Sequence, residues 1–310
     1  MATFRIGTRG SKLALAQSEQ VRDILLRSHP QYHFDLVPIK TTGDRILDAP
    51  LSKIGDKGLF TREIEKELLD GSIDLAVHSM KDMPTGLPEG LVIGAVTKRL
   101  DPRDVYIARD GRRLTDLKPG DTVATSSLRR KAQLLAWKPG LNIIDIRGNV
   151  QSRLRKMQEN PSICGIILAH AGLQRLGMLD RVTETIPDDI VISAVGQAAL
   201  AIEIRKNDRR IEDIIAVLND HDSERSIACE RTFLHELGGG CQVPIAGHAV
   251  ISGDTITLNG MVSDLDGTKA YHGAISGPVA DYERIGRELA RRLLDDGARK
   301  ILEQIYGRSL

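Results

Sequence analysis

Lys81 and Asp82 stand where side chains could do chemistry, directly after a short apolar run of buried-strand length at residues 73–77. Pro84 ends any regular element soon afterwards, because proline lacks an amide donor. Ligands of open α/β sheets bind outside the carboxyl ends of the strands, so a Lys and an Asp in this loop are placed to meet one. The alternative is an ordinary solvated loop with a local Lys–Asp pair.

Arginine residues recur where a predicted strand gives way to a helix: at Arg9, at the adjacent pair Arg129 and Arg130, and at Arg147. A guanidinium binds carboxylate or phosphate through two hydrogen bonds, and a helix N-terminus also favours negative charge. Two adjacent arginines in the first turns of a helix oppose the helix dipole unless an anion offsets them. Three such junctions predict a ligand with several carboxylates or phosphates. Helix capping by Ser11, with Arg9 on the surface, is the plainer alternative at the first junction.

A glycine run at residues 238–240 precedes Cys241. Because glycine is free of the steric limits that a Cβ imposes, this loop can project the sulfur outward rather than into a core. The thiolate is the reactive form of cysteine, and nearby Arg or Lys would lower the thiol pKa. The alternative is a tight turn with an incidental Cys. Metal binding is disfavoured, because no second Cys or His stands at ligand spacing.

A glycine-containing basic loop at residues 53–58 carries Lys53 and Lys57 ahead of a helix predicted at residues 61–69. It is not a P-loop, because the closing Lys-Ser/Thr pair is missing. Two lysines on a flexible loop fit a mobile flap over an anionic ligand, and a plain surface loop is an equal alternative.

Length and composition set the outer bounds. At 310 residues, the chain exceeds the size at which single cores stop growing, so two or three domains are expected. The net charge of +1 argues against a general nucleic-acid or membrane-surface binder. Three cysteines without paired spacing, and no secretory leader, indicate a reducing compartment, which we take to be the cytoplasm. No apolar run approaches the roughly 18 residues that a membrane helix needs.

The periodicity predicts alternating strands and helices, then a smaller α+β segment. Strands are predicted at residues 4–7, 34–39, 73–77, 91–96, 122–124, 142–146, 163–169, 246–251, 255–262 and 269–275. Helices are predicted after residue 11, at 61–69, after 127, after 149, at 226–237 and at 281–306, and an Ala-rich helix start after Gln197. Residues 101–104 suggest a crossing between domains, residues 219–223 suggest a linker, and Cys164 and Cys229 are assigned to core packing.

Several motifs together resemble those of the porphobilinogen deaminases, also called hydroxymethylbilane synthases. They are Glu230-Arg231, Phe233, Gly239-Gly240-Cys241, Val243-Pro244, His78-Ser79-Lys81-Asp82, Thr125 to Arg130, Arg147-Gly148-Asn149 and Val195-Gly196-Gln197. The resemblance runs essentially end to end. It implies two α/β domains like those of periplasmic binding proteins around a cleft, plus a small C-terminal α+β domain. The implied bounds are 1–98 with 195–217 for domain 1, 102–192 for domain 2 and 220–310 for domain 3.

The same resemblance implies a transferase of tetrapyrrole and heme biosynthesis. It would condense four porphobilinogen molecules head to tail, release ammonia and hydrolyse the product to hydroxymethylbilane. The cofactor would be a dipyrromethane, built from substrate and attached to Cys241 through a thioether. Each pyrrole carries an acetate and a propionate, which supplies the polycarboxylate that the arginine junctions predict.

The family's functional residues carry over to matching positions of this chain. Asp82 would be the catalytic carboxylate. Cofactor contacts would come from Cys241, Ser79, Lys81, Asp82, Thr125, Ser127, Arg129, Arg130, Arg147 and Gly148. Substrate contacts would come from Arg9, Ser11, Gln17, Lys53, Lys57, Arg147, Arg153, Arg175 and Gln197, with no metal. One departure from the family pattern is Ala198, which follows Gln197 where glycine is usual.

The chemistry assigns Asp82 a clear task. The substrate's aminomethyl group, with a Lys-like pKa near about 10, is already ammonium at neutral pH, so ammonia leaves without an external acid. A fixed carboxylate beside the pyrrole N–H would stabilise the azafulvenium cation left behind. The same Asp82 could then accept the proton lost from the attacked carbon.

Two other classes compete with this interpretation. A non-catalytic receptor for a polycarboxylate would suit the arginine junctions equally well, but it has no need of the glycine-flanked Cys241. A DNA-binding regulator is disfavoured, because the chain has neither a helix-turn-helix pattern nor a basic stripe. The expected partners are small molecules, with neither nucleic acid nor membrane. The resemblance implies a monomer that passes its product to uroporphyrinogen-III synthase.

Overall fold

The computed structural model describes residues 2–45, 58–239 and 243–309. These residues fall into two compact units. The first contains residues 2–45, 58–100 and 198–224, and the second contains the described parts of 101–197 and 225–309.

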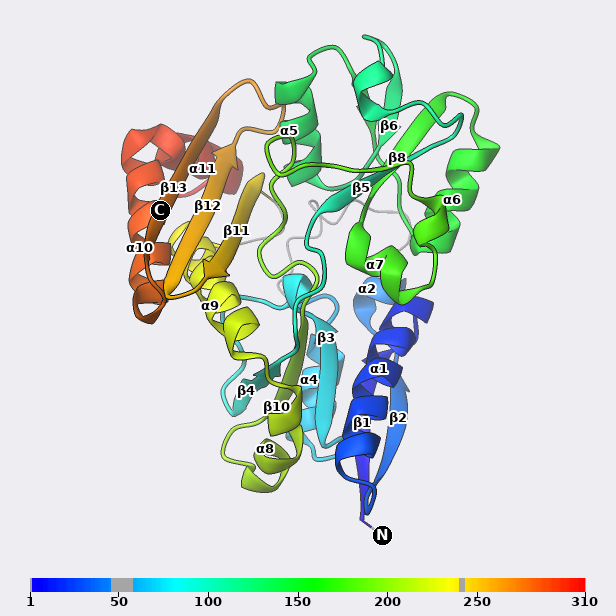
Figure 1. The fold of residues 1–310 in the computed structure, drawn as a ribbon, viewed down its shortest axis with the longest axis vertical. Coiled ribbons are helices and arrows are strands. Elements are labelled where there is room, and N and C mark those ends of the chain that lie inside the picture. Colours follow the sequence, from blue (N-terminus) through cyan, green and yellow to red (C-terminus); the bar gives the residue numbers. More distant parts are fainter. Residues whose placement is uncertain (1, 46–57, 240–242, 310) are drawn as a thin grey trace. The chain divides into compact units, whose positions relative to one another are not determined.

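The first unit is an α/β unit around one mixed sheet. Its elements are β1 (Thr3–Arg9), α1 (Lys12–Ser28), β2 (His33–Ile39), α2 (Thr42–Arg45), α4 (Arg62–Leu69), β3 (Leu75–Ser79), β4 (Leu91–Val96), β10 (Leu200–Arg205) and α8 (Arg209–Ile215). The strand order is β2-β1-β3-β10-β4, with β1 parallel to β2 and β3, and β10 antiparallel to both its neighbours. The carboxyl ends of β1 and β3 therefore share one edge of the sheet (Figure 1).

Apolar stripes attach the helices of the first unit to the sheet. Val21 and Leu25, four residues apart on α1, are buried in the same core as α8, while Ile64 and Leu68 on α4 belong to a second buried cluster. Because residues four apart lie on one face of a helix, each helix presents one apolar stripe to the strands.

One sequence-based prediction fails in this unit. The apolar stretch after Gln197 does not begin a helix, because Leu200–Arg205 forms β10 between β3 and β4. Ile202 lies opposite Val77 on one side and Ala95 on the other. A strand covered on both faces reads as a continuous apolar run, so its pattern cannot be told from that of a buried helix.

Ala198 adopts a left-handed backbone conformation, with φ of 82°. A Cβ in this region costs roughly 1–2 kcal/mol, whereas glycine adopts it without steric cost but loses about 0.5–1 kcal/mol in unfolded-state entropy. We therefore expect Ala198→Gly to raise the free energy of unfolding by about 0.5–1 kcal/mol. Urea unfolding with an unchanged m-value measures this. The same change at Ala136, an exposed helix position, should lower stability, and equal signs at the two positions would contradict the explanation.

The second unit begins with another α/β sheet. Its elements are β5 (Asp104–Ala108), β6 (Thr122–Ala124), α5 (Leu128–Trp137), β7 (Asn142–Ile144), α6 (Val150–Glu159), β8 (Ile163–Ala169), α7 (His170–Arg175) and β9 (Glu184–Thr185). The order β7-β6-β8-β5-β9 repeats the first sheet: three parallel strands, then one antiparallel strand, then an edge strand antiparallel to it. The sequence analysis missed β5, whose first residue is Asp104.

The C-terminal part of the second unit is an α+β layer, as predicted. It contains residues 225–236 of α9 (His221–Glu236), the antiparallel strands β11 (Ile245–Ser252), β12 (Thr255–Ser263) and β13 (Ala270–Pro278), and the helices α10 (Tyr282–Leu293) and α11 (Arg299–Tyr306). Phe233, Leu258 and Leu289 are fully buried in one core. Helix α10 packs against β12 and β13 (Figure 1). The helix predicted at 281–306 is interrupted by a wider turn at Leu294–Ala298, where Gly297 has φ of 129°. The fold class, two α/β sheets followed by a small α+β part, is confirmed, and the predicted domain bounds stay predictions.

The cysteines within the described residues differ in their surroundings. Cys229 is fully buried, and burial raises its thiol pKa to about 12, so its predicted packing role is confirmed. Cys164, also predicted to be core, is only half-buried, and its Sγ lies 3.6 Å from Nη2 of Arg112. Cys164 nevertheless packs against a buried cluster that includes Tyr106 and Ile167.

Candidate functional site

Lys81 and Asp82 lie in a single 3-10 turn, Met80–Asp82, that directly follows β3. The amide of Met80 donates to the carbonyl of Ala199 at 3.0 Å, and the buried side chains of Met80 and Met83 anchor both ends of the turn. Asp82 is half-buried, and the described residues contribute no hydrogen bond or ion pair to its carboxylate. The turn therefore holds a carboxylate at the strand's end without using it to support the fold.

Ser79 and Gln17, both predicted site residues, are in contact. The amide Nε2 of the buried Gln17 donates to Oγ of Ser79 at 2.9 Å, which ties α1 to the end of β3. Ser11 is the N-cap of α1, and its Oγ accepts from the amide of Ala14 at 3.2 Å. Capping thus accounts for Ser11 in the structure, as the alternative interpretation allowed.

Arg9, at the carboxyl end of β1, is held by two neighbours that the sequence did not indicate. Its guanidinium forms an ion pair with Asp44 and lies 4.1 Å from the ring centroid of Phe60. Burial raises the pKa of Asp44, but hydrogen bonds from Arg9 and Thr41 outweigh it and hold that pKa below its usual value. The ion pair and the ring contact therefore hold the Arg9 guanidinium in one position.

Arg129 and Arg130 share a single carboxylate, that of Asp104. Nη2 of Arg129 donates to Oδ2 at 2.7 Å, and Nη2 of Arg130 donates to Oδ1 at 2.7 Å. All three side chains are buried, with exposures of 6%, 5% and 0%. Nη1 of Arg129 also donates to the carbonyl of Ile192 at 2.6 Å, and Nη1 of Arg130 donates to the carbonyl of Ile167 at 3.0 Å. The anion that the arginine pair requires is thus partly supplied by the chain itself.

This buried cluster keeps a surplus positive charge, because two guanidiniums face one carboxylate. Burial raises the pKa of Asp104, but the charges of Arg129 and Arg130 overcome it and hold that pKa far below its ordinary value. Burial also lowers the pKa of Arg129, and the charge of Asp104 only partly offsets this. Nε of Arg130 is buried and has no hydrogen-bond partner among the described residues. A buried cation with an unused donor is costly unless another anion binds there.

Thr125 and Ser127 shape the turn before α5. Ser127 is the N-cap, and its Oγ accepts from the amide of Arg130 at 3.4 Å. Oγ1 of the buried Thr125 accepts from the amide of Ser127 at 3.2 Å. These local bonds hold the loop that brings the arginine pair to the carboxyl edge of the sheet.

Gly148 must be glycine where it stands. Its φ is 111°, and a Cβ would lie 2.1 Å from Oγ of Ser152. Its carbonyl accepts from Nε of Arg153 at 2.8 Å, and the carbonyl of Arg147 accepts from Nζ of Lys156 at 3.1 Å.

The end of α7 carries Arg175, and burial lowers the pKa of that guanidinium to about 10.

The structure thus places the predicted residues at two sheet edges, one in each unit. The first edge carries Arg9, Ser11, Gln17, Ser79, Lys81 and Asp82, and the second carries Thr125, Ser127, Arg129, Arg130, Arg147, Gly148, Arg153, Arg175 and Gln197. Lys53, Lys57 and Cys241 lie outside the described residues. The sequence analysis missed Asp44, Phe60 and Asp104. Asp104 directly precedes the apolar residues 105–108, and this pattern could have indicated the site. The sequence analysis instead assigned Asp104 to a crossing between domains.

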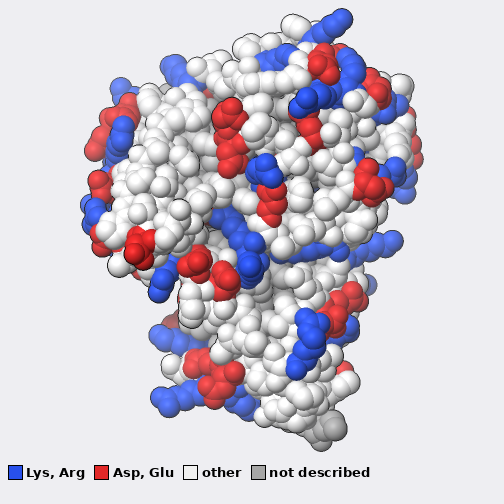
Figure 2. All heavy atoms as spheres, in the orientation of Figure 1, with Lys and Arg blue, Asp and Glu red and all other residues white. Residues whose placement is uncertain are grey.

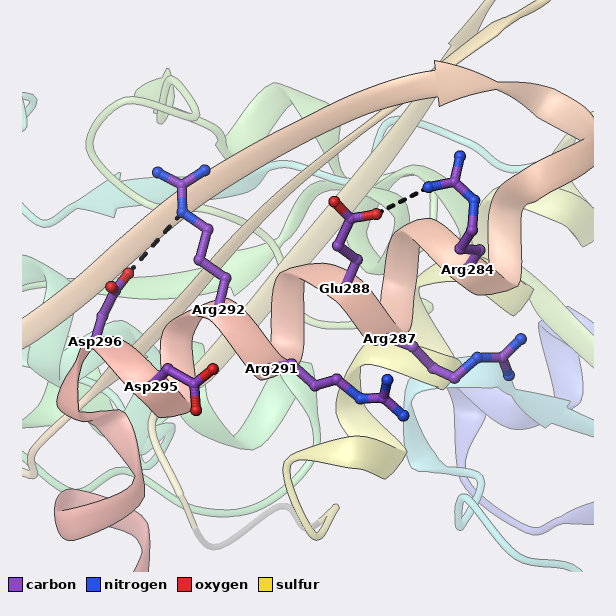
Figure 3. A pocket seen from close by; sticks show the side chains of 7 residues that line it. All are labelled: Arg284, Arg287, Glu288, Arg291, Arg292, Asp295 and Asp296. Carbon is purple, nitrogen blue, oxygen red and sulfur yellow. Dashed lines mark hydrogen bonds and ion pairs between the residues drawn. The ribbon is translucent and has the colours of Figure 1, made fainter.

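Two surface hollows lie away from these edges. One, of about 500 Å³, is bordered by charged side chains of α10 and the turn after it (Figure 3). There Arg284 pairs with Glu288 at 2.9 Å, a spacing typical of a solvated helix face. The other, of about 600 Å³, lies between α5 and the β11-β12-β13 sheet, and its lining includes Trp137, His248 and His272. Neither hollow is bordered by a predicted site residue.

Lys and Arg are interspersed with Asp and Glu over the visible surface, in agreement with a net charge of +1 (Figure 2). Residues 2–45, 58–239 and 243–309 contain no group of three or more His, Cys, Asp or Glu arranged to hold a metal ion. Within the same ranges, no helix has the length and apolar character needed to cross a membrane.

Comparison with known proteins identifies the family. The model of the porphobilinogen deaminase dipyrromethane cofactor-binding domain matches residues 4–213, and the model of the porphobilinogen deaminase C-terminal domain matches residues 225–295. The chain belongs to the porphobilinogen deaminase family. A porphobilinogen deaminase of Syntrophomonas wolfei is 50% identical over 302 residues, which cover 97% of this chain and 98% of that protein. One from Geobacter metallireducens is 49% identical over 307 residues, covering 99% and 96%.

Membership of the porphobilinogen deaminase family confirms the resemblance read from the motifs. It also confirms the predicted dipyrromethane cofactor and the enzyme activity for which the family is named. The donor set suits this cofactor, because carboxylate side chains would satisfy both the surplus charge of the arginine cluster and the unused Nε of Arg130. The roles of individual residues stay predictions.

Proposed function

We propose that this chain condenses four porphobilinogen molecules head to tail, releases ammonia and hydrolyses the product to hydroxymethylbilane. One observation carries the proposal: among the described residues, the buried arginine pair is hydrogen-bonded to a single carboxylate, that of Asp104, in a chain of the porphobilinogen deaminase family. A polycarboxylate supplies the missing negative charge, as each pyrrole with its acetate and propionate does.

The residues that would hold the cofactor come from strand ends. Arg129, Arg130 and Arg147 would bind its carboxylates, while Ser79 and Lys81 would contribute from the turn after β3. Thr125, Ser127 and Gly148 would shape the backbone around it. Arg9, Ser11, Gln17, Lys53, Lys57, Arg153 and Arg175 would bind the carboxylates of substrate and growing chain. When bound, the cofactor supplies the free pyrrole carbon to which the first substrate is joined.

Asp82 would act on the substrate's charge. Its carboxylate would stabilise the positive charge that develops on the substrate pyrrole as ammonia leaves, because a fixed charge in a partly buried site needs no reorganisation. The same carboxylate would hold the proton given up by the attacked carbon. The ammonium group needs no acid from the protein, since its pKa near about 10 keeps it protonated at neutral pH.

We expect the purified protein to carry a covalent adduct on Cys241, since the family's cofactor is attached to the protein through a thioether. Intact mass under denaturing conditions measures it, for protein made in cells that produce porphobilinogen. Cys241→Ser should show only the mass of the bare chain. Cys229→Ala and Cys164→Ser are matched controls that should keep the adduct, because Cys229 is buried in the core and Cys164 contacts Arg112. A bare-chain mass for the parent protein would overturn the attachment.

Four further proposals accompany the activity. The chain would act in the cytoplasm as a monomer and pass its product to uroporphyrinogen-III synthase. Its domains would be 1–98 with 195–217, 102–192, and 220–310. Sedimentation of the cofactor-loaded protein tests the monomer, for which a mass near 34.0 kDa is expected.

A further inference from the structure

Gln197 uses both hydrogens of its side-chain amide within the protein. The residue is 1% exposed, and its Nε2 donates to Oδ1 of Asp104 at 2.8 Å and to the carbonyl of Pro102 at 2.6 Å. An amide nitrogen carries only two donor hydrogens, so these two bonds exhaust it. Its donor side therefore faces Asp104 rather than a ligand.

The carboxylate of Asp104 consequently accepts hydrogen bonds from three side chains. Oδ1 accepts from Gln197 and from Arg130, and Oδ2 accepts from Arg129. A carboxylate held at both oxygens cannot rotate without breaking a bond, so the positions of the two guanidiniums depend on its orientation. Gln197 is the one member of this set that fixes the carboxylate without adding charge.

Gln197 is itself anchored from α9. Glu230 is fully buried, and its Oε2 accepts from the amide of Gly196 at 2.7 Å, while its Oε1 accepts from the amide of Ala249 on β11 at 2.8 Å. Gly196, with φ of 71°, directly precedes Gln197. Two buried hydrogen bonds, joined by the peptide link between Gly196 and Gln197, thus connect Glu230 to Asp104.

We propose that Gln197 is a positioning residue for Arg129 and Arg130, held in register by Glu230, and not a direct ligand of substrate. This inference rests on the proposed function, in which the two arginines bind cofactor carboxylates. Loss of the Gln197 amide would leave Asp104 held only by Arg129 and Arg130. The carboxylate and the two guanidiniums could then shift together, so that the arginines lose the spacing that matches a polycarboxylate. The defect should appear in binding and cofactor retention more than in the chemical step.

The sharpest test is Gln197→Glu, which keeps the shape and adds a titratable group. Protonated, the new acid donates one hydrogen bond to Asp104 as the amide does. Ionised, it repels Asp104 and offers Arg129 and Arg130 an internal carboxylate that competes with the ligand. Besides these three groups on β5 and α5, the charges near it are Glu230 on α9 and Asp188, whose charge also acts on Arg129. We expect KM for porphobilinogen to rise at least tenfold between pH 6 and pH 9 relative to the parent, with a smaller change in kcat.

Two variants accompany it. Gln197→Met removes both donors without a titratable group, so its KM should be raised at every pH, with the parent's profile shape. Val105→Ala is the matched control for plain loss of stability, because Val105 is fully buried on β5 beside Asp104 but takes no part in the hydrogen bonds. It should lower Tm while KM and the cofactor content, measured by intact mass, stay at parent values.

Arg130→Leu separates failure of the inference from failure of the proposed function. Normal cofactor content and KM in Arg130→Leu would overturn the proposed function itself. If Arg130→Leu loses cofactor while both Gln197 variants keep parent KM and cofactor content, the positioning role alone is overturned. It is equally overturned if Val105→Ala, at a matched loss of Tm, reproduces the changes of the Gln197 variants.

Discussion

Asp82→Asn is expected to slow ammonia release by about a hundredfold or more, the effect of losing roughly 2.7 kcal/mol of electrostatic stabilisation. Asn keeps the size and one acceptor oxygen, but the negative charge disappears. Because the described residues give the Asp82 carboxylate no partner, the substitution should leave Tm nearly unchanged. The measurement is ammonia release by variants first loaded with preassembled cofactor, so that an assembly defect cannot pass for a catalytic one.

Asp82→Glu is the conservative companion. It keeps the charge but moves it by one methylene, so slow and detectable turnover should remain. An Asp82→Asn enzyme that releases ammonia at the parent rate would show that this carboxylate does not act in the reaction. The same conclusion would follow if Asp82→Asn lowered Tm so much that unfolding accounted for the lost activity, because Asp82 would then support the fold rather than the chemistry.

The same substitution of Asp by Asn at position 104 should lower the free energy of unfolding. Asp104→Asn leaves two buried guanidiniums without their counter-ion, and breaking a buried ion pair at one partner costs about 3–5 kcal/mol. The remaining amide can accept a hydrogen bond from only one of them, and its NH₂ group faces the other donor. Urea unfolding at neutral pH measures the loss.

The pH dependence follows from the sign of the shift. The pKa of Asp104 is lower in the folded than in the unfolded protein, so its ionised form contributes stability above about pH 3.9, the unfolded value. That contribution is lost as the pH falls below this value toward the folded pKa. The difference in unfolding free energy between the parent and Asp104→Asn should therefore be full at neutral pH and shrink on acidification.

Asp110→Asn is the control for the pair at Asp104, because Asp110 and Arg112 form an exposed ion pair at 2.8 Å. Exposed pairs contribute little, so this variant should unfold close to the parent at every pH. The assigned buried ion pair would be contradicted if Asp104→Asn lowered the free energy of unfolding no more than Asp110→Asn does. It would also be contradicted if the difference in unfolding free energy between the parent and Asp104→Asn persisted unchanged in acid.

The sequence by itself determined the features that depend on near neighbours. Ser11 and Ser127 cap the helices that follow them, and Lys81 with Asp82 follows a buried strand, because a cap or a strand end is set within a few residues. The apolar periods likewise predicted most strands and helices. The family resemblance needed only the order of short motifs, which the chain carries without reference to its fold.

Tertiary structure alone decided which charges meet. Asp104 is 25 residues from Arg129 along the chain and 93 from Gln197, yet it is hydrogen-bonded to both. Likewise, 35 residues separate Arg9 from Asp44, and 62 separate Gln17 from Ser79. No local pattern records such pairings, and the arginine pair therefore suggested only an external anion.

The prediction of a helix after Gln197, where the structure has β10, was wrong for the same reason. The apolar run of β10 is compatible with a helix, and its identity comes from the ladders that β3 and β4 offer on either side. Hydrogen bonds and burial between segments far apart in sequence outweigh local propensity, because the backbone groups of a buried segment must all find partners. Local chemistry thus marks the residues of the site, and long-range pairing decides what each one contacts.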